Sequence, residues 1–173
     1  MNERPNLVTL NGKPVTLIGN EVNVGAPAPD FTVVDNNLNP VRLTDFRGKV
    51  TVISSVPSLD TPVCDMETRR FNAEAANLGP DVVILTVSMD LPFAQKRWCG
   101  AAGVDRVITL SDHREASFGT SYGVLIKELR LLARAVFVVD RQGVIRYHQL
   151  VKEVGSEPDY APILDAVRKL VKT

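Results

Sequence analysis

The fold is decided by the stretch Val50-Thr-Val-Ile-Ser-Ser-Val-Pro-Ser-Leu-Asp-Thr-Pro-Val-Cys64-Asp-Met-Glu-Thr-Arg-Arg-Phe71. Residues 50–53 are all β-branched and mostly apolar, which is typical of a short buried strand. The Ser, Pro, Asp and Thr residues that follow cannot continue it, so the chain must turn. Thr61 directly precedes Pro62, the order of an N-cap residue and a proline at the first helical position. The stretch therefore predicts a strand, a turn and a helix with Cys64 as its third residue.

In this position Cys64 lies among the first backbone N–H groups of a helix. These groups have no partner within the helix and carry partial positive charge, so they favour an anion. A thiol at such a site has its pKa lowered toward neutrality or below. The alternative is an inert buried cysteine, and the position alone leaves both interpretations open. Asp65 and Glu67 disfavour a thiolate, so a reactive Cys64 needs positive charge from elsewhere.

A wider motif surrounds this cysteine. Pro57-Ser-Leu-Asp-Thr61-Pro-Val-Cys64 fits the Pro-x-x-x-Thr-x-x-Cys signature of the peroxiredoxins, and with the following Arg69-Arg70-Phe71-Asn72 it resembles their bacterial thiol peroxidase branch. The resemblance implies that Cys64 is the peroxidatic nucleophile, that the Thr61 hydroxyl orients the sulfur and the peroxide, and that Pro57 screens the sulfur from water. It also implies a distant arginine that completes the site.

Composition excludes several other classes of protein. A chain of 173 residues is expected to be a single domain, residues 1–173, that buries about 70% of its unfolded surface. Twenty basic and twenty acidic residues give zero formal net charge, so nothing favours a nucleic acid or an anionic membrane as partner. The N-terminus lacks the features of a signal peptide, and no apolar run reaches the roughly 20 residues of a membrane span. We therefore expect a soluble cytoplasmic protein.

Metal and nucleotide sites have no support in the sequence. His113 and His148 are far apart and show no helical spacing to each other or to a cysteine, so no metal is predicted. The glycines do not form a G-x-G-x-x-G or Walker pattern, so no nucleotide cofactor is expected.

The rest of the chain completes an α/β pattern with a central mixed sheet. A hairpin is expected at residues 7–10 and 15–18 around Asn11-Gly12, as an N-terminal appendage. Further strands are expected at residues 31–34, 41–43, 82–87 and 107–110, and a second hairpin at residues 135–139 and 144–149. The first helix carries an apolar stripe at Val63, Met66, Phe71, Ala75 and Leu78; the other helices are expected after the cap Asp90-Leu91-Pro92, at residues 113–118, and from Tyr160 to Val171. This is the order of a thioredoxin-like fold, with extra strands at the front.

Cys99 is the second cysteine, in Trp98-Cys99-Gly100. The triplet resembles part of the thioredoxin motif, but residue 102 is alanine, so no C-x-x-C dithiol exists. By itself Cys99 reads as a packed cysteine near the end of a short helix. Beside Cys64 a resolving role is favoured, because a sulfenic acid needs a second thiol to avoid irreversible oxidation. The separation of the two cysteines also matches the resolving-cysteine placement in the thiol peroxidases.

Arg134 is the candidate for the missing positive charge. It precedes the strand at residues 135–139, where an arginine is often simply solvated; the peroxiredoxin resemblance favours a place in the active site. Asp60, Asp112 and Arg114 are interpreted as surface residues. Residues 122–132 form an apolar segment that either covers the core or makes an interface, and the resemblance to homodimers favours the interface.

Together these features predict a thiol-dependent peroxidase. Cys64 would reduce hydrogen peroxide and organic hydroperoxides, its sulfenic acid would condense with Cys99, and the resemblance implies that thioredoxin reduces the Cys64–Cys99 disulfide. Two cysteines on separate helices are not expected to have their Cα atoms as close as a disulfide requires, so local unwinding around one or both is expected. The alternatives are a non-catalytic redox sensor or binding module that uses the same disulfide as a switch and, disfavoured by the absent C-x-x-C, a thiol:disulfide oxidoreductase.

Overall fold

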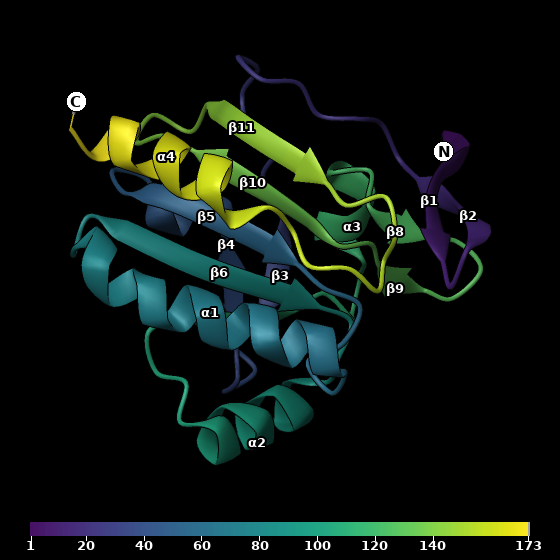
Figure 1. The fold of residues 1–173 in the computed structure, drawn as a ribbon, viewed down its shortest axis with the longest axis horizontal. Helices are drawn as coiled ribbons and strands as arrows, with labels where there is room; N and C mark the ends of the chain where they lie inside the picture. Colours follow the sequence, from purple (N-terminus) through teal and green to yellow (C-terminus); the bar gives the residue numbers. More distant parts are fainter. Residues whose placement is uncertain (173) are drawn as a thin grey trace.

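The computed structural model describes residues 1–172 and is built on a seven-stranded sheet. The strands follow the order β11-β10-β5-β6-β7-β3-β4 (Figure 1). β5, β6 and β7 are parallel, and the other pairs are antiparallel, so the sheet is mixed, as expected. The strands are β3 (Thr32–Val34), β4 (Pro40–Arg42), β5 (Val50–Ser55), β6 (Val82–Ser88), β7 (Ile108–Ser111), β10 (Ala135–Val139) and β11 (Ile145–Leu150).

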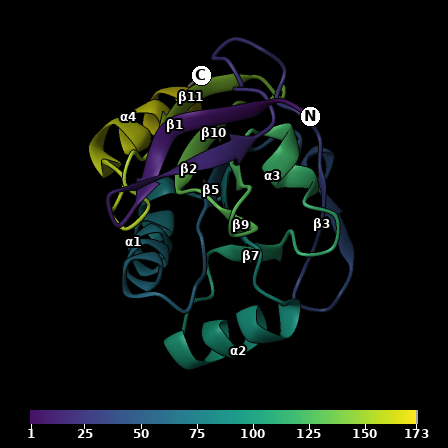
Figure 2. The same cartoon turned by 90° about the vertical axis from the view of Figure 1, so that its right-hand side faces the viewer.

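Both faces of the sheet are covered, which explains why β5 and β10 are buried along their whole length. On one face lie α1 (Pro62–Leu78), α2 (Pro92–Ala102) and α4 (Tyr160–Val171), and on the other lies the short α3 (Ser117–Ser121) (Figure 2). Phe71 of α1 and Ile163 of α4 pack on Val52 and Val138 of the sheet. Phe118 of α3 packs on the opposite face. Met66, placed on the apolar stripe of α1 by the sequence, is instead exposed, and Glu67 occupies the buried face.

The N-terminal hairpin forms as predicted, as β1 (Glu3–Leu10) and β2 (Lys13–Ile18). Its turn places Asn11 and Gly12 at φ values of 52° and 79°, which asparagine and glycine tolerate best. The hairpin is not an appendage, because β2 continues into a second sheet with β8 (Leu125–Ile126) and β9 (Leu131–Leu132). Val8 and Leu17 are buried in the core that this sheet shares with α3.

The interpretation of residues 122–132 as an interface is wrong for most of its apolar side chains, although Leu129 is exposed. Tyr122, Leu125, Ile126 and Leu132 are all buried inside the chain, where they join the hairpin to the central sheet. Only the turn at residues 127–130 is exposed. The segment lacks clean periodicity because β8 and β9 have two residues each, too few to show an alternating pattern.

Asp112 was expected at the surface, yet it is buried at the start of the loop that leads into α3. Its carboxylate accepts hydrogen bonds from the backbone N–H groups of Phe118 (3.0 Å) and Gly119 (2.8 Å). Burial raises the pKa of Asp112 to about 6. Because Asp112 ties the loop down, the helix begins at Ser117 rather than at residue 113 as predicted. Asp60 and Arg114 are exposed, as expected.

Glu153 anchors the hairpin turn to the loop after β11. Its carboxylate accepts hydrogen bonds from Thr9 Oγ1 and from the backbone N–H groups of Gly12 and Gly155, which are 2.9 Å away in each case. These bonds, led by the one from Gly155, lower the pKa of Glu153 to about 2. The depressed pKa means that the stabilisation is present above the unfolded value of about 4.3 and is lost as the pH falls toward 2.

Glu153→Gln is therefore expected to lower the thermal midpoint at neutral pH and to flatten its fall between about pH 4 and 2. An amide offers one oxygen where the carboxylate offers two, and its NH₂ group faces donors. Thermal unfolding followed by circular dichroism at several pH values measures both effects. Glu153→Asp keeps the charge and should lie between the two. An unchanged midpoint and an unchanged pH dependence in Glu153→Gln would rule out this anchor.

Across residues 1–172, the structure contains no helix with the length and apolar character needed to cross a membrane.

Candidate active site

Cys64 lies where the predicted strand, turn and helix meet. α1 begins at Pro62, Thr61 occupies the N-cap position, and Cys64 is the third helical residue, all as expected. Cys64 thus lies in the first turn of α1, where the N–H groups lack helical partners and the helix dipole is positive. Pro57 is buried in the turn between β5 and α1. The Thr61 hydroxyl makes no capping bond; it donates to the Ser58 carbonyl oxygen, 2.9 Å away, and so fixes the turn.

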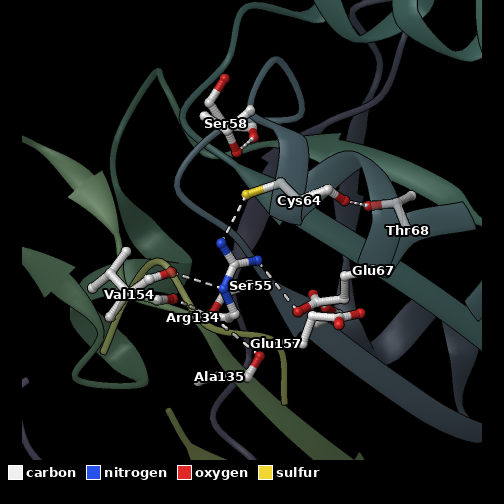
Figure 3. A network of polar contacts seen from close by, with 12 residues as sticks. Ser55, Ser58, Cys64, Glu67, Thr68, Arg134, Ala135, Val154 and Glu157 are labelled. Atoms are coloured by element: carbon white, nitrogen blue, oxygen red, sulfur yellow. Dashed lines mark hydrogen bonds and ion pairs between the residues drawn. The ribbon is translucent and has the colours of Figure 1, made fainter. Parts of the chain in front are cut away.

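Arg134 meets Cys64 inside the protein. Its Nη2 atom is 3.2 Å from Cys64 Sγ, its Nη1 is 3.3 Å from Glu67 Oε1, and its Nε donates to the Val154 carbonyl oxygen at 2.9 Å (Figure 3). The arginine side chain is 1% exposed and Cys64 is 0% exposed. Arg134 is therefore not a solvated strand end; it is a buried cation whose guanidinium lies between the sulfur and a carboxylate.

The sheet topology explains how residues 70 positions apart come into contact. β10 runs antiparallel to β5, and Ala135 pairs with Ser55. The start of β10 thus lies beside the end of β5, where the chain turns into α1. The Ser55 hydroxyl donates to the Ala133 carbonyl oxygen at 2.8 Å and holds this crossing together.

Glu67 is a site residue that the sequence reasoning treated only as an unfavourable charge. It is 0% exposed, and its carboxylate is held by Arg134 and by the Ser54 hydroxyl, which is 2.7 Å from Oε2. Burial raises the pKa of Glu67, while the bonds from Ser54 and Arg134 act in the opposite direction. A signal was present: Cys64, Glu67 and Phe71 follow the i, i+3, i+7 spacing of one helix face, and a carboxylate on a buried face requires a buried partner.

The turn between β5 and α1 is fixed by hydrogen bonds to Asp90, which follows β6 in the chain. The Asp90 carboxylate accepts hydrogen bonds from the Ser58 hydroxyl (2.7 Å), the Leu59 N–H (2.8 Å) and the Ser88 hydroxyl (2.7 Å). Asp90 was expected to begin the cap of α2, but Leu91 is the N-cap residue and Pro92 follows it. The Asp90 side chain stabilises the Cys64 turn instead.

A thin apolar cover separates Cys64 from solvent. Val56 and Leu59 pack around the sulfur, and the half-buried Trp98 of α2 packs against this cluster. Leu59 and Trp98 also line a groove between the turn and α2. Two of the three residues that pack against Cys64 therefore also form part of the wall of this groove.

Cys99 lies near the end of α2, on the same helix as Trp98, and is half-buried. Its Sγ is 3.4 Å from the Thr109 hydroxyl on β7. Both cysteines are free thiols, and each has its own polar partners. The structure thus brings Cys64, Thr61, Pro57 and Arg134 into one site, with Cys99 held on a separate helix.

No group of three or more His, Cys, Asp or Glu side chains suited to a metal ion occurs within residues 1–172. The polar chemistry at Cys64 comes from the chain's own guanidinium, carboxylate and hydroxyl groups.

Comparison with known proteins places this geometry in a family. The family model described as Redoxin matches residues 23–164, which include both cysteines and Arg134. The chain belongs to the Redoxin family. Among Redoxin relatives, it is 58% identical to the thiol peroxidase of Bacillus subtilis (strain 168), over 95% of this chain and 98% of the relative. It is 60% identical to the thiol peroxidase of Oceanobacillus iheyensis, over 94% of this chain and 98% of the relative.

Solved structures of Redoxin-type proteins agree. A peroxiredoxin-like protein from Aquifex aeolicus superimposes with a TM-score of 0.89 at 43% identity, covering 95% of this chain and 97% of the other. A thiol peroxidase from Chromobacterium violaceum, at 20% identity, shares the fold with a TM-score of 0.83, over 94% of this chain and 95% of that one. These findings confirm the thioredoxin-like fold and the resemblance to the thiol peroxidase branch, and they support a peroxiredoxin-type peroxidase.

Proposed function

We propose that this Redoxin protein reduces hydrogen peroxide and organic hydroperoxides, with Cys64 as the peroxidatic cysteine. The observation that carries the proposal is the 3.2 Å contact between Cys64 Sγ and Arg134 Nη2 in a water-excluded site. A guanidinium donor at this distance, together with the N–H groups at the start of α1, suits a thiolate and the negative charge that develops during its reaction.

In the first step the Cys64 thiolate attacks one oxygen of the hydroperoxide. The S–O bond forms as the O–O bond breaks, and the departing oxygen leaves as water or an alcohol after it takes up a proton. Arg134, which contacts the sulfur, and the N–H groups at the start of α1 are proposed to stabilise the negative charge that develops. Thr61 is proposed to orient the peroxide and Pro57 to limit access of water. In the reduced protein the Thr61 proton is directed at Ser58, which keeps the turn in shape.

In the second step the Cys99 sulfur attacks the sulfenic acid of Cys64. The S–S bond forms, the S–O bond breaks, and the hydroxyl leaves as water. A disulfide needs Cα atoms about 4.4 to 6.8 Å apart. Because each cysteine is inside a helix and is held by different partners, α2 must partly unwind. Only Pro92 and Gln95 of α2 are fully buried, so this helix is a segment that opens at low cost.

The proposal extends to the setting of the reaction. The family resemblance supports thioredoxin as the dithiol that reduces the Cys64–Cys99 disulfide, a homodimer, and a cytoplasmic location. Residues 1–173 are proposed to act as one domain. In each cycle the two cysteine thiols give two electrons to one hydroperoxide and become a disulfide. Thioredoxin then returns two electrons to that disulfide.

The test is hydroperoxide consumption by the full chain with thioredoxin, thioredoxin reductase and NADPH. We expect many turnovers per chain with both hydrogen peroxide and cumene hydroperoxide, read as NADPH oxidation. A non-catalytic sensor would consume one equivalent and stop. That result with every dithiol reductant tried would refute a peroxidase and leave the switch function.

A further inference from the structure

Cys99 is held in a short chain of hydrogen bonds that the peroxidase reaction itself does not require. Its sulfur is 3.4 Å from Thr109 Oγ1, and Thr109 Oγ1 is 3.0 Å from Asn36 Oδ1. Thr109 lies on β7 and is 3% exposed. Asn36 lies in the loop between β3 and β4. Three side chains from three separate segments thus meet under the end of α2.

The direction of these hydrogen bonds follows from which atoms of Asn36, Thr109 and Cys99 can donate a proton. Asn36 Oδ1 is an acceptor, so Thr109 donates its only hydroxyl proton to it. The Thr109 oxygen can then only accept from Cys99, which makes the thiol the donor. The chain therefore runs from the Cys99 S–H to Thr109 and on to Asn36, and it exists only while Cys99 carries its proton.

The acceptor end of this chain is fixed by the sheet and by a tight turn. β3 pairs with β7 through Val34 and Ser111, which brings the residues that follow β3 beside Thr109. The Asp35 carboxylate accepts from the N–H groups of Asn37 (2.8 Å) and Asn39 (2.9 Å) and closes the turn around Asn36. Asn36 is thus positioned by the fold and not by its contact with Thr109 alone.

Apolar contacts also hold this end of α2, because Trp98 and Ala102 pack against the neighbouring apolar clusters. The sheet beneath it is polar: Ser54, Thr86 and Thr109 are in register across β5, β6 and β7 and are all buried. The nearby Arg69 of α1 lies over the Trp98 ring and donates to the Ala102 carbonyl oxygen at 3.3 Å. At Cys99 itself the sheet presents a hydroxyl group, so the hydrogen bond to Thr109 contributes to holding the sulfur in place.

We infer that Thr109 and Asn36 are positioning residues for Cys99: they hold its thiol, as a hydrogen-bond donor, on the folded α2 and set how often it is released. The consequence for catalysis rests on the proposed resolving role. To condense with the Cys64 sulfenic acid, Cys99 must give up this bond, and its proton leaves with the hydroxyl group as water. Thr109 and Asn36 thus slow disulfide formation and lengthen the life of the sulfenic acid, which can be oxidised further to sulfinic acid.

The first test measures release of Cys99 without any peroxide chemistry. In a Cys64→Ser protein Cys99 is the only thiol, and its alkylation by iodoacetamide is followed by mass spectrometry. Adding Thr109→Val is expected to accelerate alkylation about two- to tenfold, the equivalent of one net hydrogen bond. Thr109→Ser should restore the slow rate. The matched control is Thr86→Val, on the neighbouring strand in the same register, because the Thr86 hydroxyl has no hydrogen-bond partner in residues 1–172.

Two results would overturn the inference. One is that Cys99 is alkylated at the same rate in the Cys64→Ser protein with and without Thr109→Val. The other is equal acceleration in Thr86→Val, which would show general loosening of the sheet. Urea unfolding measures the global stability of each variant. If the proposed hydrogen-bond chain holds Cys99, the alkylation rate changes without a matching change in the free energy of unfolding.

Asn36→Ala tests the direction of the bonds. Without Asn36 the Thr109 proton is free to point at the sulfur, and a donor favours the thiolate. The pH profile of Cys99 alkylation is therefore expected to move to lower pH in Asn36→Ala, a shift that loosening alone would not produce. An unmoved profile would contradict the assignment of Cys99 as donor.

The last measurement uses the protein with both cysteines. After a pulse of hydrogen peroxide, rapid acid quenching should show faster disulfide formation and less sulfinic acid in Thr109→Val, with an unchanged first reaction of Cys64. If Thr109→Val accelerates alkylation but no variant forms a disulfide, Thr109 does position Cys99, and the proposed resolving role of Cys99 is wrong. Equal disulfide rates with and without Thr109 would remove the proposed effect on catalysis.

Discussion

Cys64→Ser is expected to abolish hydroperoxide turnover, whereas Cys99→Ser is expected to keep the first reaction and lose recycling. The reason is that the sulfur of Cys64, and not that of Cys99, contacts the Arg134 guanidinium, the donor that supports attack on the O–O bond. Cys99 has a neutral hydroxyl as its neighbour. With one equivalent of peroxide per chain, Cys99→Ser should react once and then show no further turnover in the thioredoxin assay.

Stopped-flow measurement of peroxide consumption separates the two steps. Dimedone should trap a sulfenic acid on Cys64 in Cys99→Ser, and no adduct should form in Cys64→Ser. With excess peroxide, Cys99→Ser should accumulate sulfinic acid at Cys64 faster than the unchanged protein. Equal loss of the first reaction in both variants would overturn the assignment of the two roles.

Arg134→Met is expected to slow the reaction of Cys64 with peroxide about a hundredfold or more, as loss of a preorganised donor does at comparable sites. The substitution also leaves Glu67 buried without its cation, and breaking a buried ion pair costs about 3–5 kcal/mol. That cost is a large part of a typical stability of about 5–15 kcal/mol. The rate effect must therefore be separated from unfolding.

The double variant Glu67→Gln with Arg134→Met provides this separation. It removes both charges while the amide can still accept from Ser54. Its single-turnover rate is compared with that of Glu67→Gln, which keeps Arg134, and circular dichroism checks that both are folded. The hypothesis of a guanidinium-supported thiolate fails if the double variant and Glu67→Gln react with peroxide at the same rate.

Much of the fold could be read from local sequence patterns. The apolar run at residues 50–53, the Thr61-Pro62 pair and the turn at Asn11-Gly12 each act over a few neighbouring residues, and each forms its predicted element. The stripe on α4 is equally reliable, since Ile163, Leu164 and Val167 are all buried. These features succeed because strand, cap and turn preferences are set by the local backbone.

Other features were wrong or missed because they depend on partners outside one strand or helix. Asp112 is buried because the first N–H groups of α3 need an acceptor, and Glu67 is buried because Arg134 crosses beneath it. A charged residue alone predicts exposure, and a buried partner, supplied by the following helix for Asp112 and by the sheet for Glu67, reverses that expectation. Most apolar side chains of residues 122–132 are likewise buried in the core that they share with the N-terminal hairpin.

By itself the sequence determined that a thiol stands at the entrance of a helix that follows a buried strand, because caps and strands are local properties. Only the tertiary structure decided what surrounds that thiol. The antiparallel pairing of β10 with β5 brings Arg134 within 3.2 Å of Cys64, and the pairing of β3 with β7 brings Asn36 to Thr109 beneath Cys99. Hydrogen bonds and charge pairs act over a few ångströms, so strand order rather than spacing along the chain selects the partners of both cysteines.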